Sequence, residues 1–183
     1  MVEKPLCSLA GASGERHRWA MKTLLIVWHS RTGGARAMAQ AAADAARTGA
    51  EVNVRLVAAE AAGPEDLLAA DGYIFAGPEN LAALSGEMKA FFDRSYYPAL
   101  ERLNGRPYAL MICAGSDGEN AVRQAARIAL GWRLRPAAEP IIVCTHAQTP
   151  EAIAAPKTIA PDELQRCADM GAALAAGLAM GIF

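Results

Sequence analysis

The sequence has no apolar run that approaches the roughly 20 residues of a membrane-spanning helix, and its apolar residues 6–10 are too few for a signal peptide. Eighteen lysine and arginine residues nearly balance 19 aspartate and glutamate residues, so the formal net charge is -1. A chain without a strong field of one sign has no general attraction for nucleic acid or anionic lipid. We therefore expect a soluble cytoplasmic protein with no nucleic-acid and no membrane partner.

Cysteine is scarce and widely spaced. Cys7, Cys113, Cys144 and Cys167 contain no C-x-x-C pair, which excludes the common zinc spacing and gives no disulfide framework. A reducing compartment is the simplest setting. Cys113 and Cys144 fall in apolar segments that we predict to be central strands, where a thiol behaves as a small apolar side chain. We expect no metal site.

At 183 residues the chain suits one domain with a sizeable core. The first residues show neither helical nor strand periodicity, and we predict a flexible N-terminal extension over residues 1–21 and one folded domain over residues 22–183. Met21 is an alternative start of the chain. We find no internal repeat and no domain linker.

Five short apolar segments have the composition of β-strands: residues 23–28, 51–57, 73–76, 107–113 and 140–144. The second alternates apolar and polar residues and is predicted to be a half-exposed edge strand. Helical segments lie between and after them, at residues 35–47, 64–71, 85–94, 119–132 and 161–178. This alternation predicts an α/β fold with a parallel sheet that is covered on both faces.

The helix boundaries carry their own signals. We expect the first helix to end at Gly49 in a left-handed conformation, and Ser85 to cap the third helix. Met88, Phe91 and Phe92 follow the i, i+3, i+4 spacing of a face that packs on the core. Residues 145–160 form an irregular surface excursion to which the sequence assigns no role.

Three predicted strand exits are rich in glycine and small polar residues: 29–34, 77–80 and 114–118. In a parallel sheet the ligand crevice lies beyond the carboxyl ends of the strands. Turn formation explains a single glycine-rich loop adequately. Three such loops at one edge predict a ligand site.

The first of these exits has the chemistry of an anion site. The hydroxyls of Ser30 and Thr32 and the backbone N–H groups of residues 31–35 converge on a helix N-terminus. Neither G-x-x-x-x-G-K-[ST] nor G-x-G-x-x-G follows the first strand, which excludes the common triphosphate and dinucleotide loops. His29 and Ser30 also stand where a response-regulator receiver needs acidic residues.

These segments resemble a known family. The turn after the first strand, Ser30-Arg31-Thr32-Gly33-Gly34-Ala35, resembles the S-x-T-G-x-T phosphate turn of flavodoxins. The segment from Gly77-Pro78 through Asp93-Arg94 resembles the P-x…S-G-x-M-K-x-F-x-D-R segment of NAD(P)H-dependent FMN and quinone reductases. The resemblance implies a flavodoxin-like three-layer α/β/α sandwich with a five-stranded parallel sheet of order 2-1-3-4-5.

The resemblance also implies an FMN site. It assigns the phosphate to Ser30, Arg31, Thr32, Gly33, Gly34 and Ala35. It places the isoalloxazine ring against Pro78, Glu79, Asn80 and Leu81, and the outer edge of the ring near Gly115, Ser116, Asp117 and Gly118. No side chain is expected to serve as an obligatory acid or base, because the cofactor supplies the chemistry.

The function implied is an oxidoreductase that takes a hydride from NAD(P)H to FMN and passes electrons to a small-molecule acceptor such as a quinone. A one-electron carrier that docks on partner proteins, and an interaction domain without cofactor, are the alternatives. The net charge of -1 argues against a carrier, which usually has a strongly acidic surface. The acceptor, the choice of nicotinamide and homo-oligomer formation stay open.

Two departures from the family pattern bear on the site. Ala35 replaces the second threonine of the phosphate turn, and Glu79 adds an acid beside a ligand that carries a phosphate, so we expect modest phosphate affinity. No Trp or Tyr stands at the exits of the third and fourth strands, which leaves one flavin face open to nicotinamide. Trp28 and His29 are interpreted as packing residues, and Asp93 with Arg94 as a structural pair.

Overall fold

The computed structural model describes residues 21–183, so all but the last residue of the predicted extension lies outside the described residues. The main strands are β1 Thr23–Trp28, β2 Asn53–Ala58, β3 Gly72–Asn80, β5 Pro107–Ala114 and β7 Ile141–Cys144, with two-residue strands β4 Ala83–Leu84 and β6 Arg135–Pro136. The helices are α1 Gly34–Gly49, α2 Pro64–Leu68, α3 Gly86–Ala99, α4 Glu119–Gly131, α5 Pro150–Ala154 and α6 Pro161–Met180. None of the helices in residues 21–183 combines the length and apolarity that crossing a membrane requires.

The predicted strand order is confirmed. Strands β2, β1, β3 and β5 are neighbours and parallel, and β6 and β7 both pair with the far edge of β5. Strand β6 pairs with the start of β5, and β7 pairs with its end, from Met111 to Ala114. Because β2 pairs only with β1, it is the edge strand that its alternating sequence indicated.

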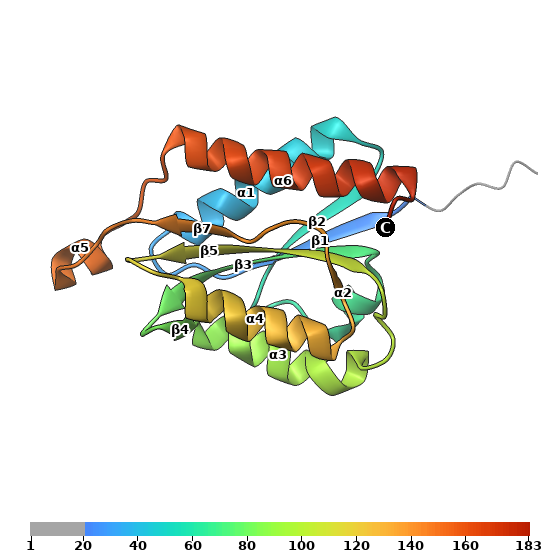
Figure 1. The fold of residues 1–183 in the computed structure, drawn as a ribbon, viewed down its shortest axis with the longest axis horizontal. Coiled ribbons are helices and arrows are strands. Elements are labelled where there is room, and N and C mark those ends of the chain that lie inside the picture. Colours follow the sequence, from blue (N-terminus) through green and yellow to red (C-terminus); the bar gives the residue numbers. More distant parts are fainter. Residues whose placement is uncertain (1–20) are drawn as a thin grey trace, which may run out of the picture.

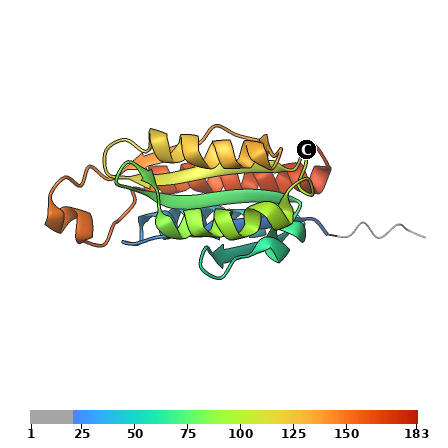
Figure 2. The same ribbon diagram turned by 90° about the horizontal axis from the view of Figure 1, so that it is seen from below.

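Helices cover both faces of the sheet (Figures 1 and 2). Leu24 and Ile26 of β1 pack with α1 and α6, while Leu25 and Val27 pack on the opposite face; all four are fully buried. That opposite face holds the predicted stripe of Met88, Phe91 and Phe92, packed around Phe75 and Trp132. The sandwich therefore has two cores, one on each side of the sheet, and α1 and α6 approach so closely that a Cβ on Gly171 would collide with the carbonyl oxygen of Ala42.

Strand β3 runs further than the sequence indicated. The segment 77–80, which we had expected to be a loop, continues the strand because Glu79 and Asn80 pair with Leu84 and Ala83 of the antiparallel β4. Leu81 and Ala82 form the turn, with φ of 52° and 56°. This hairpin projects from the carboxyl edge of the sheet as a wall.

Two expectations about helix ends are corrected. Gly49 stays within α1, is not left-handed, and the chain leaves through an extended Ala50, because an extended residue at that point leads directly into β2. Ser85 does occupy the N-cap of α3, but within residues 21–183 its buried hydroxyl accepts no capping hydrogen bond and has no other partner. The excursion of residues 145–160 contains a short helix, α5, that the sequence did not indicate.

Candidate functional site

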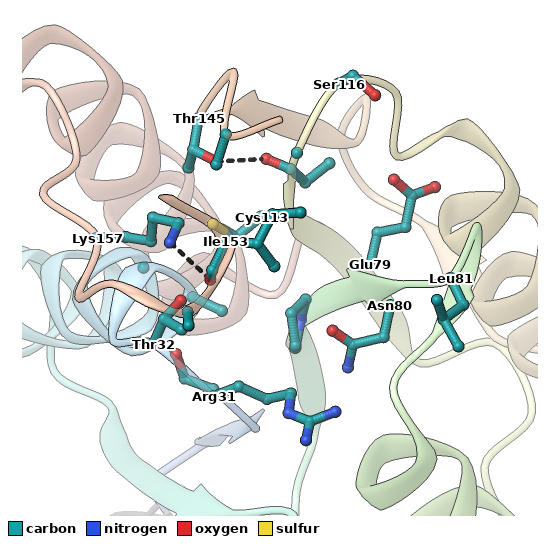
Figure 3. Close-up of a pocket in the computed structure, with 18 residues that line it drawn as sticks. Arg31, Thr32, Glu79, Asn80, Leu81, Cys113, Ser116, Thr145, Ile153 and Lys157 are labelled. Atoms are coloured by element: carbon teal, nitrogen blue, oxygen red, sulfur yellow. Dashed lines mark hydrogen bonds between the residues drawn. The ribbon is translucent and has the colours of Figure 1, made fainter. Parts of the chain in front are cut away.

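A pocket of about 720 Å³ opens at the carboxyl edge of the sheet, between the exits of β1, β3, β5 and β7 (Figure 3). The predicted site residues that line it are Ser30, Arg31, Thr32, Gly34, Ala35, Pro78, Glu79, Asn80, Leu81, Gly115 and Ser116. The structure therefore brings together three segments that the sequence had grouped only by their positions after strands.

Gly33, Asp117 and Gly118 do not line the pocket. Gly33 and Gly118 are left-handed, with φ of 94° and 89°, and each starts a helix beside the site. The side chain of Asp117 accepts from the N–H of Glu119 at the start of α4. These three residues shape the turns beside the pocket, and their predicted role as direct contacts stays a prediction.

The turn after β1 presents backbone donors toward the pocket. The N–H of Gly33 donates to Ser30 Oγ at 3.0 Å, so this group, which the sequence had counted as free, is already bonded. Helical bonding begins when the N–H of Ala37 donates to Gly33. The N–H groups of Gly34, Ala35 and Arg36, in the first turn, have no acceptor among the described residues and lie at the positive end of α1, where an anion is stabilised.

The site also has a fourth wall, from the excursion of residues 145–160, that sequence reasoning missed. Its pocket-lining residues, with two from the end of β5, are Cys113, Ala114, Thr145, Ala147, Ile153, Ala154 and Lys157. The N–H of Lys157 donates to the carbonyl of Thr32 at 2.7 Å, which fixes the excursion on the phosphate turn. The position of this segment after the last parallel strand was the one available signal.

The β3–β4 hairpin is held in place from α4. The amide of Asn120 donates to the carbonyl of Ala82 at 2.7 Å, and Gln124 accepts from the N–H of Leu84 at 2.9 Å. Leu81, at the tip, is fully exposed. The wall that carries Glu79 and Asn80 is therefore braced on its outer side.

Glu79 and Asn80 point in different directions within the pocket. Figure 3 shows the carboxylate of Glu79 directed toward Ser116, and the amide of Asn80 toward Arg31. The Oε1 atom of Glu79 is buried and has no hydrogen-bond partner among the described residues. The expected acid therefore lies at the opposite end of the pocket from the phosphate turn, with an acceptor that a ligand N–H could satisfy.

The pocket thiol is not activated. Burial raises the pKa of Cys113 to about 11, and the nearby Lys157 only partly offsets this effect. Cys113 is therefore protonated at neutral pH and serves as apolar lining. Cys144, predicted to be central, instead lies half-exposed on the edge strand β7, and burial raises its pKa as well.

His29 is buried beside the pocket and does not line it. Its Nδ1 is 2.7 Å from Glu60 Oε1, and its Nε2 is 3.2 Å from Glu87 Oε2 but not in hydrogen-bonding geometry. Trp28 packs under the guanidinium of Arg36 at 5.5 Å. Neither residue lines the pocket, which fits their interpretation as packing residues.

Asp93 and Arg94 do not pair with each other. Asp93 binds Lys89 on the helix surface, whereas Arg94 donates to the carbonyls of Ala59 and Ala62 in the loop after β2. Neither lines the pocket. Their structural role holds, but the predicted pair is wrong, because adjacent helical residues point in directions about 100° apart.

Comparisons with known proteins agree with this fold. A family model described as NADPH-dependent FMN reductase matches residues 59–140, which include the β3 exit and the S-G-x-M-K segment. A flavodoxin from Streptococcus pneumoniae superposes with a TM-score of 0.67 at 22% identity, covering 84% of this chain and 98% of that one. The chain has a flavodoxin-like fold.

Two proteins match part of this flavodoxin-like chain in sequence. A flavodoxin of Aquifex aeolicus is 38% identical over 73 residues, 40% of each chain. An NAD(P)H dehydrogenase (quinone) of Acidithiobacillus ferrooxidans is 34% identical over 95 residues, 41% of this chain and 48% of the other. The matches thus span less than half of each relative, one a flavodoxin and the other an NAD(P)H dehydrogenase (quinone) by name.

Proposed function

We propose that the chain binds FMN in this pocket and acts as an NAD(P)H-dependent oxidoreductase that passes a hydride through the flavin to a small acceptor such as a quinone. The observation that carries the proposal is the polarity of the pocket. Three open N–H donors lie at one end, and the partnerless carboxylate oxygen of Glu79 lies at the other. A phosphate requires the first, and the N–H of the pyrimidine ring of a flavin matches the second.

The residues present fit FMN along the length of the pocket. The N–H groups of Gly34, Ala35 and Arg36, with the hydroxyls of Ser30 and Thr32, would hold the phosphate. Pro78 to Leu81 and Gly115 to Ser116 would border the ring. A volume of about 720 Å³ is within the range of cofactor pockets, roughly 300–1,000 Å³.

FMN, when bound, supplies the hydride acceptor and donor. The role of the chain itself is to position the flavin and to shield it. The braced hairpin fixes the wall that carries Glu79 and Asn80, and the protonated thiol of Cys113 keeps the floor of the pocket neutral. Among the described residues, no group at the pocket is arranged as a general acid–base pair, which fits a reaction whose proton and electron chemistry belongs to the cofactor.

The pocket wall favours a reductase over a one-electron carrier. Its lining residues include no Phe, Tyr or Trp, so no aromatic ring of the described chain covers a bound flavin. An open face lets nicotinamide and then the acceptor stack in turn. The similarity to an NAD(P)H dehydrogenase (quinone) supports the same choice, while the flavodoxin match keeps the carrier as the alternative.

The proposal is tested on the purified chain in two steps. Chromatography of released flavin, followed by titration of the apoprotein, should show FMN and not FAD. Anaerobic mixing of the loaded protein with NADH or NADPH should bleach the flavin absorbance, and a quinone should restore it. Recovery of FAD, or no flavin uptake, refutes the site; FMN binding without bleaching by either nicotinamide refutes the reductase and leaves the carrier.

A further inference from the structure

The excursion of residues 145–160 reaches the phosphate turn through one residue, Lys157. Its N–H bonds to the carbonyl of Thr32 at 2.7 Å. Its Cβ lies 3.4 Å from the position that a Cβ on Gly34 would occupy. Lys157 is therefore in contact with the first turn of α1, where the open donors are.

The charges around the pocket single out the same residue. Arg31, Glu79 and Lys157 are the charged residues among those that line it. Figure 3 shows the guanidinium of Arg31 extending toward Asn80 and Glu79 directed toward Ser116, whereas Lys157 lies beside Thr32. Lys157 is thus the lining cation from outside the turn whose backbone and Cβ contact the turn and the start of α1.

The ammonium of Lys157 is held by neutral groups. Its Nζ donates to the carbonyls of Ala152, Ile153 and Ala155 at 2.6, 2.9 and 2.6 Å, around the end of α5. These carbonyls are neutral acceptors, whereas a phosphate carries full negative charge and attracts the ammonium more strongly, so it can take one of these donors from a carbonyl. The three carbonyls hold only the tip of the side chain, and the flexible stem of the lysine lets the ammonium exchange one of them for a phosphate while its backbone stays bonded to Thr32.

We propose that Lys157 is a phosphate-binding residue that the excursion supplies in place of the hydroxyl missing at Ala35, and that it ties α5 to the occupied phosphate site. The proposal rests on the proposed function, since it assumes that the phosphate of FMN occupies the turn. The proposal gives the excursion a role in specificity, because the ammonium of Lys157 selects phosphorylated over unphosphorylated flavin.

The test compares FMN with riboflavin, which has the same ring and no phosphate, in fluorescence titrations of the apoprotein. Lys157→Gln should weaken FMN binding about ten- to hundredfold and leave riboflavin binding unchanged. Lys157→Arg should recover most of the FMN affinity. The FMN affinity of the unchanged chain should fall with added salt more steeply than that of Lys157→Gln.

Lys89→Gln removes an exposed lysine that binds Asp93 away from the pocket, and it should change neither affinity. Equal weakening of FMN and riboflavin binding by Lys157→Gln would show that Lys157 only supports the excursion. No weakening of either would show that Lys157 does not contribute to ligand binding. Both outcomes overturn the role of Lys157 and leave the proposed function standing. An unchanged chain that binds neither flavin refutes the proposed function as well.

Discussion

The Sγ atom of Cys113 lies 2.6 Å from the position that a Cβ on Gly34 would take, so β5 and the first residue of α1 meet with no room for a side chain. Gly34→Ala must displace Cys113 or shift the start of α1. We expect a loss of about 1–3 kcal/mol in the free energy of unfolding, typical of overpacking, together with weaker FMN binding. Urea unfolding and FMN titration measure the two effects.

A second substitution separates this contact from other effects of alanine. Gly34→Ala combined with Cys113→Ala should recover most of the lost stability, because the nearest obstacle is gone. Gly86→Ala is the matched control: it also lies at the start of a helix, and its Cβ would meet nothing within 4 Å, so it should not destabilise. No recovery in the double variant would mean that Ile159 or Lys157, at 3.3 and 3.4 Å, sets the limit.

Arg94 is predicted to hold the loop that follows β2. Its guanidinium donates to the carbonyls of Ala59 and Ala62. Arg94→Met keeps much of the apolar stem and should cost about 1.5–3 kcal/mol, the value of hydrogen bonds to a charged group, with FMN affinity unchanged. Asp93→Asn, which breaks an exposed pair with Lys89, should cost less than about 0.5 kcal/mol. Equal effects in chemical denaturation would contradict this assignment.

Glu60 should contribute to stability in a pH-dependent way. A backbone hydrogen bond, followed by the hydrogen bond and charge of His29, lowers the pKa of Glu60 below its ordinary value of 4.5. A carboxyl whose pKa is lower in the folded state than in the unfolded state stabilises the fold, and this contribution is complete at pH values above the unfolded pKa. The contribution is lost as the pH falls through the folded pKa. Glu60→Gln should therefore destabilise at pH 7, and the difference from the unchanged chain should shrink below about pH 4.5.

Thermal unfolding across that pH range measures the effect. Exposed Glu51→Gln provides the comparison for a carboxylate on the surface. A stability difference for Glu60→Gln that stays constant down to pH 3 would show that the carboxyl is not coupled to folding.

Thr32→Val should weaken FMN binding while the fold stays intact. The change removes a hydroxyl that lines the pocket, keeps the side-chain volume, and leaves the carbonyl that accepts from Lys157. A hydrogen bond to a charged group corresponds to about ten- to hundredfold in affinity. Thr48→Val, at the far end of α1, should leave the dissociation constant unchanged. If Thr32→Val binds FMN as tightly as the unchanged chain, the phosphate lies elsewhere.

Periodicity and turn residues were sufficient to predict the alternation of strands and helices and the three exits that meet at the pocket, whereas the strand order was implied by the family resemblance. They could not predict the longer β3, because its last residues are ordered by pairing with Ala83 and Leu84, a tertiary contact that no local pattern contains. They also missed Lys157. Its place over Thr32 depends on how the excursion returns across the sheet edge, and its sequence neighbourhood resembles any surface loop.

The partner of Arg94 was missed for a related reason: the loop after β2 lies far from it in sequence, and a neighbouring Asp93 offered a simpler pairing. The direction of Glu79 is a third case. Only the register of the hairpin decides that its carboxylate faces Ser116, while Asn80 faces Arg31.

The last prediction separates the reductase from the carrier, and it concerns Asn80. This residue lines the pocket on the braced hairpin, and none of the lining residues is aromatic. Asn80→Phe should place a ring over part of the flavin face, so that hydride transfer from NAD(P)H slows more than FMN binding weakens.

Exposed Arg123→Phe, on α4 outside the pocket, controls for a new surface aromatic and should change neither quantity. Anaerobic stopped-flow bleaching and FMN titration measure the two effects separately. If Asn80→Phe weakens FMN binding and leaves the bleaching rate of the loaded protein unchanged, nicotinamide does not approach the flavin on this side, and the argument from an open face fails.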